Sequence, residues 1–270
     1  VFSVITGDRD AGAALAASPS VSMISFTGSS LTGSKIMNAC APKLSQVALE
    51  LGGKSALVVF EDTDLDQAVE TTMKGFLTNG GQICTAHTRL VVQEGLKAPL
   101  LDKLKEELEK LPFCNDPITE KDRGDRAGEA GMTDVVQPVV CESQHQKILG
   151  FLDEAKAVGV EVVTGGGVPD VEAVGNSGGY FIQPTVLTNV ACDSDVWQKE
   201  VFGPVLSVRS FSTEQEAVQE ANSTAFGLAS TVMSSDPAKA MRVANRIRAG
   251  AVYATSTGEG LLAEHPAVSR

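Results

Sequence analysis

Short apolar runs alternate with amphipathic stretches along the first fifty residues. Apolar positions at 1–6, 21–26 and 46–51 predict three strands, and a glycine closely follows each run. The stretches 10–17 and 31–41 between them have the composition and spacing of short helices. Strands that alternate with helices indicate βαβ units and a mostly parallel sheet.

A second block of alternating elements begins at residue 55. Two polar, glycine-rich stretches at 115–133 and 165–179 interrupt it and predict surface loops. Residues 254–270 are small, polar and aperiodic, which predicts a frayed tail. The predicted elements are strands at 55–60, 89–92, 160–163, 180–187, 205–211, 228–233 and 251–253, and helices at 65–76, 99–111, 144–158, 213–222 and 237–248. This pattern favours an α/β fold, which alone names no reaction.

Composition and charge exclude several classes of protein. The 270 residues are 43% hydrophobic, enough for a sizeable core, which excludes a wholly disordered chain. A formal net charge of −12 argues against binding of nucleic acid through a broad basic face. No apolar run approaches the ~18 residues of a membrane helix, so we expect no membrane span.

Cysteine and histidine usage indicates the compartment. Five cysteines, an odd number with no CxxC pair, predict free thiols in a reducing intracellular compartment, either the cytoplasm or an organelle matrix. The three histidines lack metal-ligand spacing, so we expect no metal site.

One cysteine follows a glycine cluster, in the sequence NGGQICTA at 79–86. Glycines permit left-handed backbone and the close approach of a ligand. A thiol on such a turn can be exposed and held by backbone amides, which favours the thiolate and stabilises an anion. Cys84 is therefore a candidate nucleophile. The alternative is a buried, small hydrophobic residue, the more frequent role of a free cysteine.

A carboxylate ends the third predicted strand, in the sequence ELGGKS at 50–55. Glutamate in an apolar strand is disfavoured unless it is paired or functional. At the carboxyl edge of a parallel sheet, where ligand sites of α/β proteins form, Glu50 could act as a general base. The alternative is a simple ion pair with Lys54.

Two further segments carry weaker signals. The sequence FTGSSLTG at 26–33 is a glycine turn that leads into a helix, where free N–H groups and the helix dipole suit a phosphate. It lacks the Lys-Ser/Thr ending of a P-loop. The sequence EVFGPV at 200–205 places an acid and an aromatic residue on a Gly-Pro turn before a strand.

In this order, the four segments resemble the aldehyde dehydrogenase superfamily. ELGGKS and GQICTA are specific signatures of that family, and the similarity extends from about residue 4 to residue 253. The flanking sequences FTGSSLTGSKIM, YFIQPTVL, VWQKEVFGPVL and ANSTAFGLAS are most similar to the betaine aldehyde and aminoaldehyde dehydrogenases. The resemblance implies the C-terminal part of a Rossmann-type NAD(P)-binding domain at 1–51, an α/β catalytic thiol domain at 52–253 and a divergent tail at 254–270.

The resemblance also implies roles for single residues. Cys84 matches the nucleophile, Glu50 matches the general base, and Asn79 is structural. The cofactor, NAD or NADP, is expected to contact Gly28, Ser29, Gly33, Leu51, Glu200 and Phe202. Of these, Ser29 matches the residue at the pyrophosphate, and Glu200 and Phe202 match the pair that holds the nicotinamide riboside.

The implied reaction is the oxidation of a small aldehyde to its carboxylic acid. The Cys84 thiolate attacks the carbonyl to give a thiohemiacetal, which the Cys84 N–H helps to stabilise. Hydride transfer leaves a thioester, and Glu50 activates the water that hydrolyses it. The partner is the aldehyde, and full-length members of the family are homo-oligomers.

Some family features have no counterpart in these residues. The N-terminal half of the family's chain, with an oxyanion-hole Asn and a ribose-contacting Lys, is not found, so we expect Val1 to be a cut edge. No assembly strand is recognisable after residue 253. The betaine branch commonly has an aromatic residue six positions before the nucleophile, where this chain has Thr78.

Two other functions stay open at this point. One is a truncated, catalytically inactive homologue that serves as a binding or scaffold protein. The other is a thiol esterase, because a thiol and a general base can cleave activated esters without a nucleotide and His87 lies three residues after Cys84.

Overall fold

The computed structural model describes residues 2–113, 134–174, 178–255 and 261–264. The loop predicted at 115–133 lies outside the described residues. The chain divides into two compact units, Val1–Gly52 and Gly53–Arg270, each with its own sheet.

The first unit is a βαβ arrangement preceded by a helix. Its strands β1 and β2 pair in parallel, with Gly28 opposite Leu51, and α2 connects them. Both helices have a polar cap, because the Asp8 carboxylate accepts a hydrogen bond at the start of α1 and the Ser29 hydroxyl accepts one at the start of α2. The elements are α1 (Arg9–Ala17), β1 (Met23–Gly28), α2 (Ser30–Cys40), the 3-10 helix η1 (Ala41–Lys43) and β2 (Gln46–Leu51).

The strand predicted at 1–6 is wrong. Residues 2–7 have no regular structure and are exposed. An apolar run becomes a strand only where a neighbouring strand satisfies its backbone groups, and no described strand pairs with this run. The other two strands and both helices predicted in this unit are confirmed.

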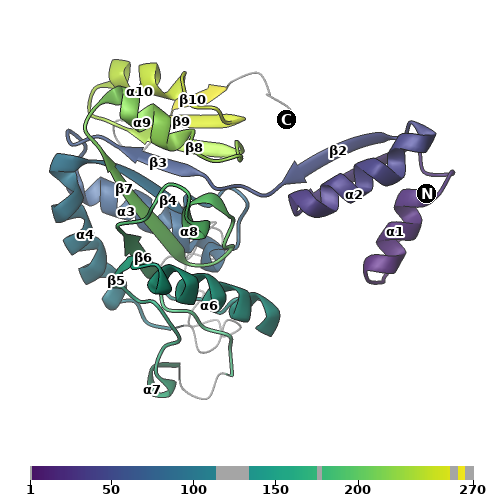
Figure 1. Cartoon of the computed structure of the whole chain (residues 1–270), viewed down its shortest axis with the longest axis horizontal. Helices are drawn as coiled ribbons and strands as arrows, with labels where there is room; N and C mark the ends of the chain where they lie inside the picture. Colours follow the sequence, from purple (N-terminus) through teal and green to yellow (C-terminus); the bar gives the residue numbers. More distant parts are fainter. Residues whose placement is uncertain (1, 114–133, 175–177, 256–260, 265–270) are drawn as a thin grey trace. The chain divides into compact units, whose positions relative to one another are not determined.

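The second unit is an eight-stranded sheet in the order β10-β9-β8-β3-β4-β7-β6-β5, with helices around it (Figure 1). The inner pairs are parallel, and the pairs at the two edges, β10 with β9 and β5 with β6, are antiparallel. The strands are β3 (Ala56–Val59), β4 (Arg89–Gln93), β5 (Glu161–Thr164), β6 (Thr185–Thr188), β7 (Val205–Phe211), β8 (Ala229–Met233), β9 (Ala251–Thr255) and β10 (Leu261–Glu264). The helices are α3 (Leu65–Leu77), η2 (Thr78–Gly81), α4 (Glu94–Glu109), α6 (Glu142–Ala157), α7 (Val171–Val174), α8 (Asp195–Gln198), α9 (Glu214–Ala221) and α10 (Pro237–Ala244).

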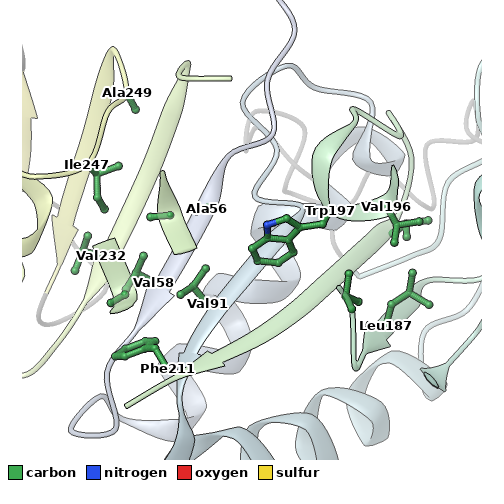
Figure 2. Close-up of a cluster of buried hydrophobic side chains, with 14 of the residues drawn as sticks. Ala56, Val58, Val91, Leu187, Val196, Trp197, Phe211, Val232, Ile247 and Ala249 are labelled. Atoms are coloured by element: carbon green, nitrogen blue, oxygen red, sulfur yellow. The ribbon is translucent and has the colours of Figure 1, made fainter. Parts of the chain in front are cut away.

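The central strand β3 is buried on both faces. Ala56 and Val58 join a cluster beneath α6, α9 and α10, whereas Leu57 and Val59 join a cluster beneath α3 and α4. Figure 2 shows part of the first cluster, with the Trp197 ring close to the strands that carry Val58 and Val91. A strand covered on both faces has an all-apolar composition, which explains the run of hydrophobic residues in β3.

A buried arginine joins the segment before β3 to the end of α9. Arg89, the first residue of β4, is 3% exposed. Its Nε donates to the Lys54 carbonyl (2.8 Å), and its terminal nitrogens donate to the carbonyls of Glu220 (2.8 Å) and Ala221 (2.7 Å). The guanidinium also lies 5.0 Å from the centroid of the Trp197 ring. These bonds compensate the cost of burying the charge.

The predicted α/β fold with a mostly parallel sheet is confirmed, with shifted element boundaries. α4 begins at Glu94, upstream of the predicted start at Pro99. The strand predicted at 180–187 shortens to β6, because Pro184 has no N–H to donate and Tyr180 forms only an isolated bridge with Val139.

The prediction that 254–270 is a frayed tail is wrong in part. Residues Leu261–Glu264 form β10, which pairs antiparallel with β9 at the edge of the sheet. The open edge of β9 provides backbone partners that a periodicity argument does not include. None of the described helices combines the length and apolar character needed to cross a bilayer.

Candidate active site

Three of the predicted functional segments lie at the same edge of the second unit's sheet. Gly53 comes shortly before β3, Cys84 before β4, and Glu200 before β7. These strands are parallel neighbours in the order β3-β4-β7, so their amino ends meet at one edge. Parallel pairing therefore brings together segments that are far apart in the sequence.

The second glycine of ELGGKS lies where the three segments meet. The Gly53 N–H donates a hydrogen bond to Glu200 Oε1 (3.0 Å). A Cβ at Gly53 would lie 2.2 Å from the Cys84 carbonyl oxygen, which is less than any real contact. Only glycine lets the backbone pass so close to the Cys84 peptide, so Gly53 fixes the separation of the cysteine and glutamate segments.

The residues before Cys84 adopt a left-handed backbone. Asn79, Gly80 and Gly81 have φ of 55°, 64° and 71°. A Cβ at Gly81 would lie 2.3 Å from the Gly203 carbonyl oxygen, so this turn packs directly on the Gly-Pro turn that precedes β7. The glycine cluster thus has a packing requirement as well as a conformational one.

Cys84 lies on a turn closed by a hydrogen bond from the Ala86 N–H to the Ile83 carbonyl (3.0 Å). The thiol is half-buried, and the Cys84 N–H donates to no acceptor in the described part of the chain. An amide with no internal acceptor beside a thiol can donate to the oxyanion of a carbonyl adduct in which that sulfur is bonded to the carbonyl carbon. The alternative role of Cys84, a fully buried hydrophobic residue, does not fit this placement.

Two glutamines to which the sequence analysis gave no role hold the site segments in place. Gln82 accepts from the Val140 N–H (2.9 Å) and donates to the Asn79 carbonyl (3.1 Å). Gln144, in the first turn of α6, donates to the carbonyls of Val201 (2.9 Å) and Phe202 (2.8 Å). Because Val140 lies 58 residues from Gln82, and Val201 and Phe202 lie 57 and 58 residues from Gln144, no local pattern identifies these roles.

Phe202 has a left-handed φ of 60°, which is unusual for an aromatic residue. The Gln144 amide bonds to the two carbonyls at this position offset the cost of that conformation. Lys147, one turn further along α6, donates to the Glu200 carbonyl (3.3 Å). α6 therefore holds three consecutive carbonyls of the segment 200–202.

The placement of His87 does not support a role as general base for Cys84. Its Nε2 lies 2.9 Å from the Thr231 hydroxyl, and burial lowers the pKa of the imidazole to about 4. A ring with that pKa is a poor proton acceptor near neutral pH. The Cys84–His87 pairing behind the esterase hypothesis therefore has no support in the geometry.

Lys54 is buried without compensation. The side chain is 1% exposed, and its Nζ has no hydrogen-bond partner among the described residues, which argues against the predicted ion pair. Burial lowers the pKa of the amine to about 7; the nearby Arg89 lowers it further and Glu200 opposes the shift.

The other predicted site residues belong to the first unit. Gly28 and Leu51 are paired at the carboxyl ends of β1 and β2, and Ser29 caps α2. A Cβ at Gly33 would lie 2.8 Å from Leu51 Cδ2, so Leu51 packs against the helix at a position that needs glycine. Glu50 is exposed at the end of β2. Its role as a base for Cys84 stays a prediction.

The contact at Gly53 predicts the effect of a single methyl group. We expect Gly53→Ala to lower the free energy of unfolding by about 2 kcal/mol or more, because the new methyl displaces the Cys84 peptide. Urea unfolding followed by the fluorescence of Trp197, the single tryptophan, measures this change. Gly150→Ala is the matched control, since a Cβ there meets nothing within 4 Å. Equal stability of the two variants would show that the close approach is absent.

The lowered pKa of Lys54 predicts that the free energy of unfolding rises with pH. The unfolded lysine has a pKa near 10.5 and the folded one near 7, so between these values the unfolded chain binds more protons. The free energy of unfolding should therefore rise by about 2 kcal/mol from pH 7 to pH 9.

The variant Lys54→Met should lose this rise and be more stable than the wild type at pH 7. Lys105→Met, on the exposed side of α4, is the control that should keep it. Urea unfolding at both pH values measures the difference, and identical pH dependence in Lys54→Met and the wild type contradicts the assignment.

Comparison with known proteins supports the family resemblance that the sequence motifs indicate. The aldehyde dehydrogenase family matches residues 1–266. Aminoaldehyde dehydrogenase 1, peroxisomal, of Pisum sativum is 44% identical over 254 residues, which are 94% of this chain and 47% of that protein. Betaine aldehyde dehydrogenase, chloroplastic, of Beta vulgaris is 42% identical over the same shares of both chains.

Solved structures show the same similarity. The crystal structure of betaine aldehyde dehydrogenase from Staphylococcus aureus in complex with NAD+ has a TM-score of 0.79 and 36% identity, over 90% of this chain and 45% of that one. An NAD-dependent aldehyde dehydrogenase from Sinorhizobium meliloti has a TM-score of 0.79 and 34% identity. The chain spans about half the length of the relatives it matches. The chain belongs to the aldehyde dehydrogenase family.

Proposed function

We propose that these residues supply the thiol nucleophile and part of the cofactor site of an NAD(P)-dependent enzyme that oxidises an aldehyde to a carboxylic acid. The observation that carries the proposal is the meeting of Cys84, Gly53 and Glu200 at one sheet edge, with a Cys84 N–H that has no acceptor in the described structure. The relatives named above as aldehyde dehydrogenases support it.

The residues present suit a dinucleotide. At the start of α2, the N–H groups of Ser30 and Leu31 donate to no described acceptor, which suits a phosphate oxygen. Glu200 uses Oε1 to accept from Gly53, and no described residue donates to its Oε2, which leaves this oxygen for a ribose hydroxyl. Ser29, Glu200 and Phe202 are the residues that we expect to hold NAD or NADP.

The chain's own residues then have the following roles. The Cys84 sulfur bonds to the aldehyde carbon while the Cys84 N–H donates to the carbonyl oxygen as it becomes an oxyanion. Bound NAD(P)+ supplies the hydride acceptor that turns this adduct into a thioester. Glu50 takes a proton from water, the resulting hydroxide attacks the thioester carbon, and the carboxylic acid leaves as the Cys84 thiolate is restored.

The compartment and partners follow from the same proposal. We expect a small aldehyde as the substrate and a homo-oligomeric enzyme, as in the family. A reducing compartment, either the cytoplasm or an organelle matrix, keeps the Cys84 thiol free.

Absorbance of the reduced nicotinamide tests the proposal. With an aldehyde and NAD or NADP, we expect Cys84→Ser to lose at least about 10³-fold of the rate because the oxygen nucleophile is far less reactive. Glu50→Gln should keep a first-turnover burst and slow the steady state by about 10²-fold or more, because only thioester hydrolysis needs the base. Cys192→Ser, at an exposed thiol, is the control that should match the wild type.

The outcomes separate the three functions. Cleavage of an activated ester that needs Cys84, with no hydride transfer from an aldehyde to NAD or NADP, would indicate an esterase. Absence of both hydride transfer and ester cleavage in the wild type would indicate an inactive binding protein. Either result contradicts the proposal.

A further inference from the structure

A small cavity lies in the second unit at the amino ends of β8, β3 and β4, three neighbouring parallel strands. Its volume is about 10 Å³, which is room for one water molecule or one monatomic ion. Segments far apart in the sequence line it, among them Lys54 before β3, Arg89 in β4, Ala221 at the end of α9 and residues 247–249 after α10. The fold alone therefore creates this cavity.

The Lys54 side chain lies on the same face of the sheet as the cavity. The Arg89 N–H donates to the Ser55 carbonyl (3.2 Å), so the pairing of β3 with β4 continues to Ser55. Side chains alternate between the two faces along such a segment, and Lys54 therefore shares the face of Ala56. That face carries Ile247, which lines the cavity and belongs to the same buried cluster as Ala56 (Figure 2).

The amine of Lys54 is the unsatisfied cation at this cavity. Its three N–H donors have no hydrogen-bond partner among the described residues, and the side chain is 1% exposed. The two arginines that line the cavity, Arg89 and Arg248, both donate to main-chain carbonyls. No Asp or Glu side chain is among the described lining residues. The cavity thus has an excess of positive charge and lacks an acceptor for Lys54.

The charged groups around Lys54 do not supply this acceptor. The positive charge of Arg89, on β4, disfavours the protonated amine, and the negative charge of Glu200, before β7, favours it. Glu200 Oε1 accepts from the Gly53 N–H (3.0 Å), and neither carboxylate oxygen bonds to the amine. A buried ammonium without a partner either loses its proton or binds an acceptor from outside the chain.

We propose that this cavity binds one small monovalent anion of the size of chloride, which accepts hydrogen bonds from the protonated amine of Lys54. The volume excludes polyatomic anions such as sulfate and phosphate. The site needs neither an aldehyde nor a dinucleotide, so it goes beyond the proposed function.

The proposal makes binding of the anion depend on pH. Burial lowers the pKa of Lys54 to about 7, so the amine is mostly protonated at pH 6 and mostly neutral at pH 9. Only the protonated amine attracts an anion. Chloride should therefore stabilise the folded chain at pH 6 and lose this effect as the pH rises through 7.

Urea unfolding followed by circular dichroism tests the proposal. Sodium chloride is compared with sodium gluconate, whose anion is far larger than the cavity, at the same ionic strength. With chloride at about ten times its dissociation constant, the equilibrium constant for folding should rise about tenfold at pH 6. At pH 9 the two salts should give the same equilibrium constant.

Two variants and one direct measurement locate the site. Lys54→Met keeps the length of the side chain without the amine, so chloride and gluconate should be equivalent at both pH values. Lys105→Met, at an exposed position of α4, is the matched control that should respond as the wild type does. A wild-type crystal soaked in sodium bromide should show an anomalous scattering peak beside Lys54 Nζ, a result that does not depend on any variant.

The outcomes decide the proposal independently of hydride transfer. A chloride effect that disappears in Lys54→Met, together with a bromide peak at the amine, supports it. An equal chloride effect in Lys54→Met and the wild type would overturn it, because the anion would then act elsewhere. A cavity that holds only a water molecule in the bromide-soaked crystal would also overturn it.

Discussion

The site depends on one close approach between two backbones. Gly53 and the Cys84 peptide are so near that no side chain fits between them, and the Gly53 N–H holds a Glu200 carboxylate oxygen at 3.0 Å. The parallel order β3-β4-β7 brings the three segments to the same edge, and the glycine lets them touch. The Cys84 peptide and the Glu200 carboxylate therefore share one fixed reference point, the backbone of Gly53. Functional groups must be held to within about 0.5 Å of their working positions, and here one glycine fixes three connecting segments at that scale.

Burial of charge accompanies this arrangement. Arg89 is buried but donates to several carbonyls, so its charge is compensated and it links β4 to the end of α9. Lys54, whose carbonyl accepts one of these hydrogen bonds, is also buried, but its amine has no hydrogen-bond partner among the described residues. The first residue stabilises the edge, and the second destabilises it in the charged form. Proteins tolerate such strain most often where function requires a particular arrangement.

Much of the fold follows from local pattern. The βαβ alternation, the caps at Asp8 and Ser29 and the all-apolar β3 are visible in single stretches of sequence. The errors occur where a partner distant in the sequence decides the outcome. The run at 1–6 has no described strand to pair with, and residues 261–264 become a strand because β9 offers an open edge. Periodicity describes a segment's own preferences and not the neighbours it finds.

The candidate site shows the same contrast between features visible in local sequence and features that depend on distant partners. Cys84, Gly53 and Glu200 belong to short motifs that the sequence shows directly, because each places its functional candidate beside one or more glycines. Gln82 and Gln144 hold those motifs through bonds to residues 57 or 58 positions away, and neither role is visible in the sequence, although Gln82 lies within one of the motifs. Candidate site residues can thus be predicted from the sequence, whereas the hydrogen bonds that hold their segments in place need the fold.

Hydrogen exchange tests the central claim, that the contacts of Gly53 hold the segments of Cys84 and Glu200 together. Peptides covering 52–56 and 79–88 are followed by mass spectrometry in the wild type, in Glu200→Ala and in the control Asp193→Ala, which changes an exposed acid on the same connection. The account predicts faster exchange in both peptides of Glu200→Ala and no change in Asp193→Ala. Exchange that rises only in 52–56, or in neither peptide, would contradict it.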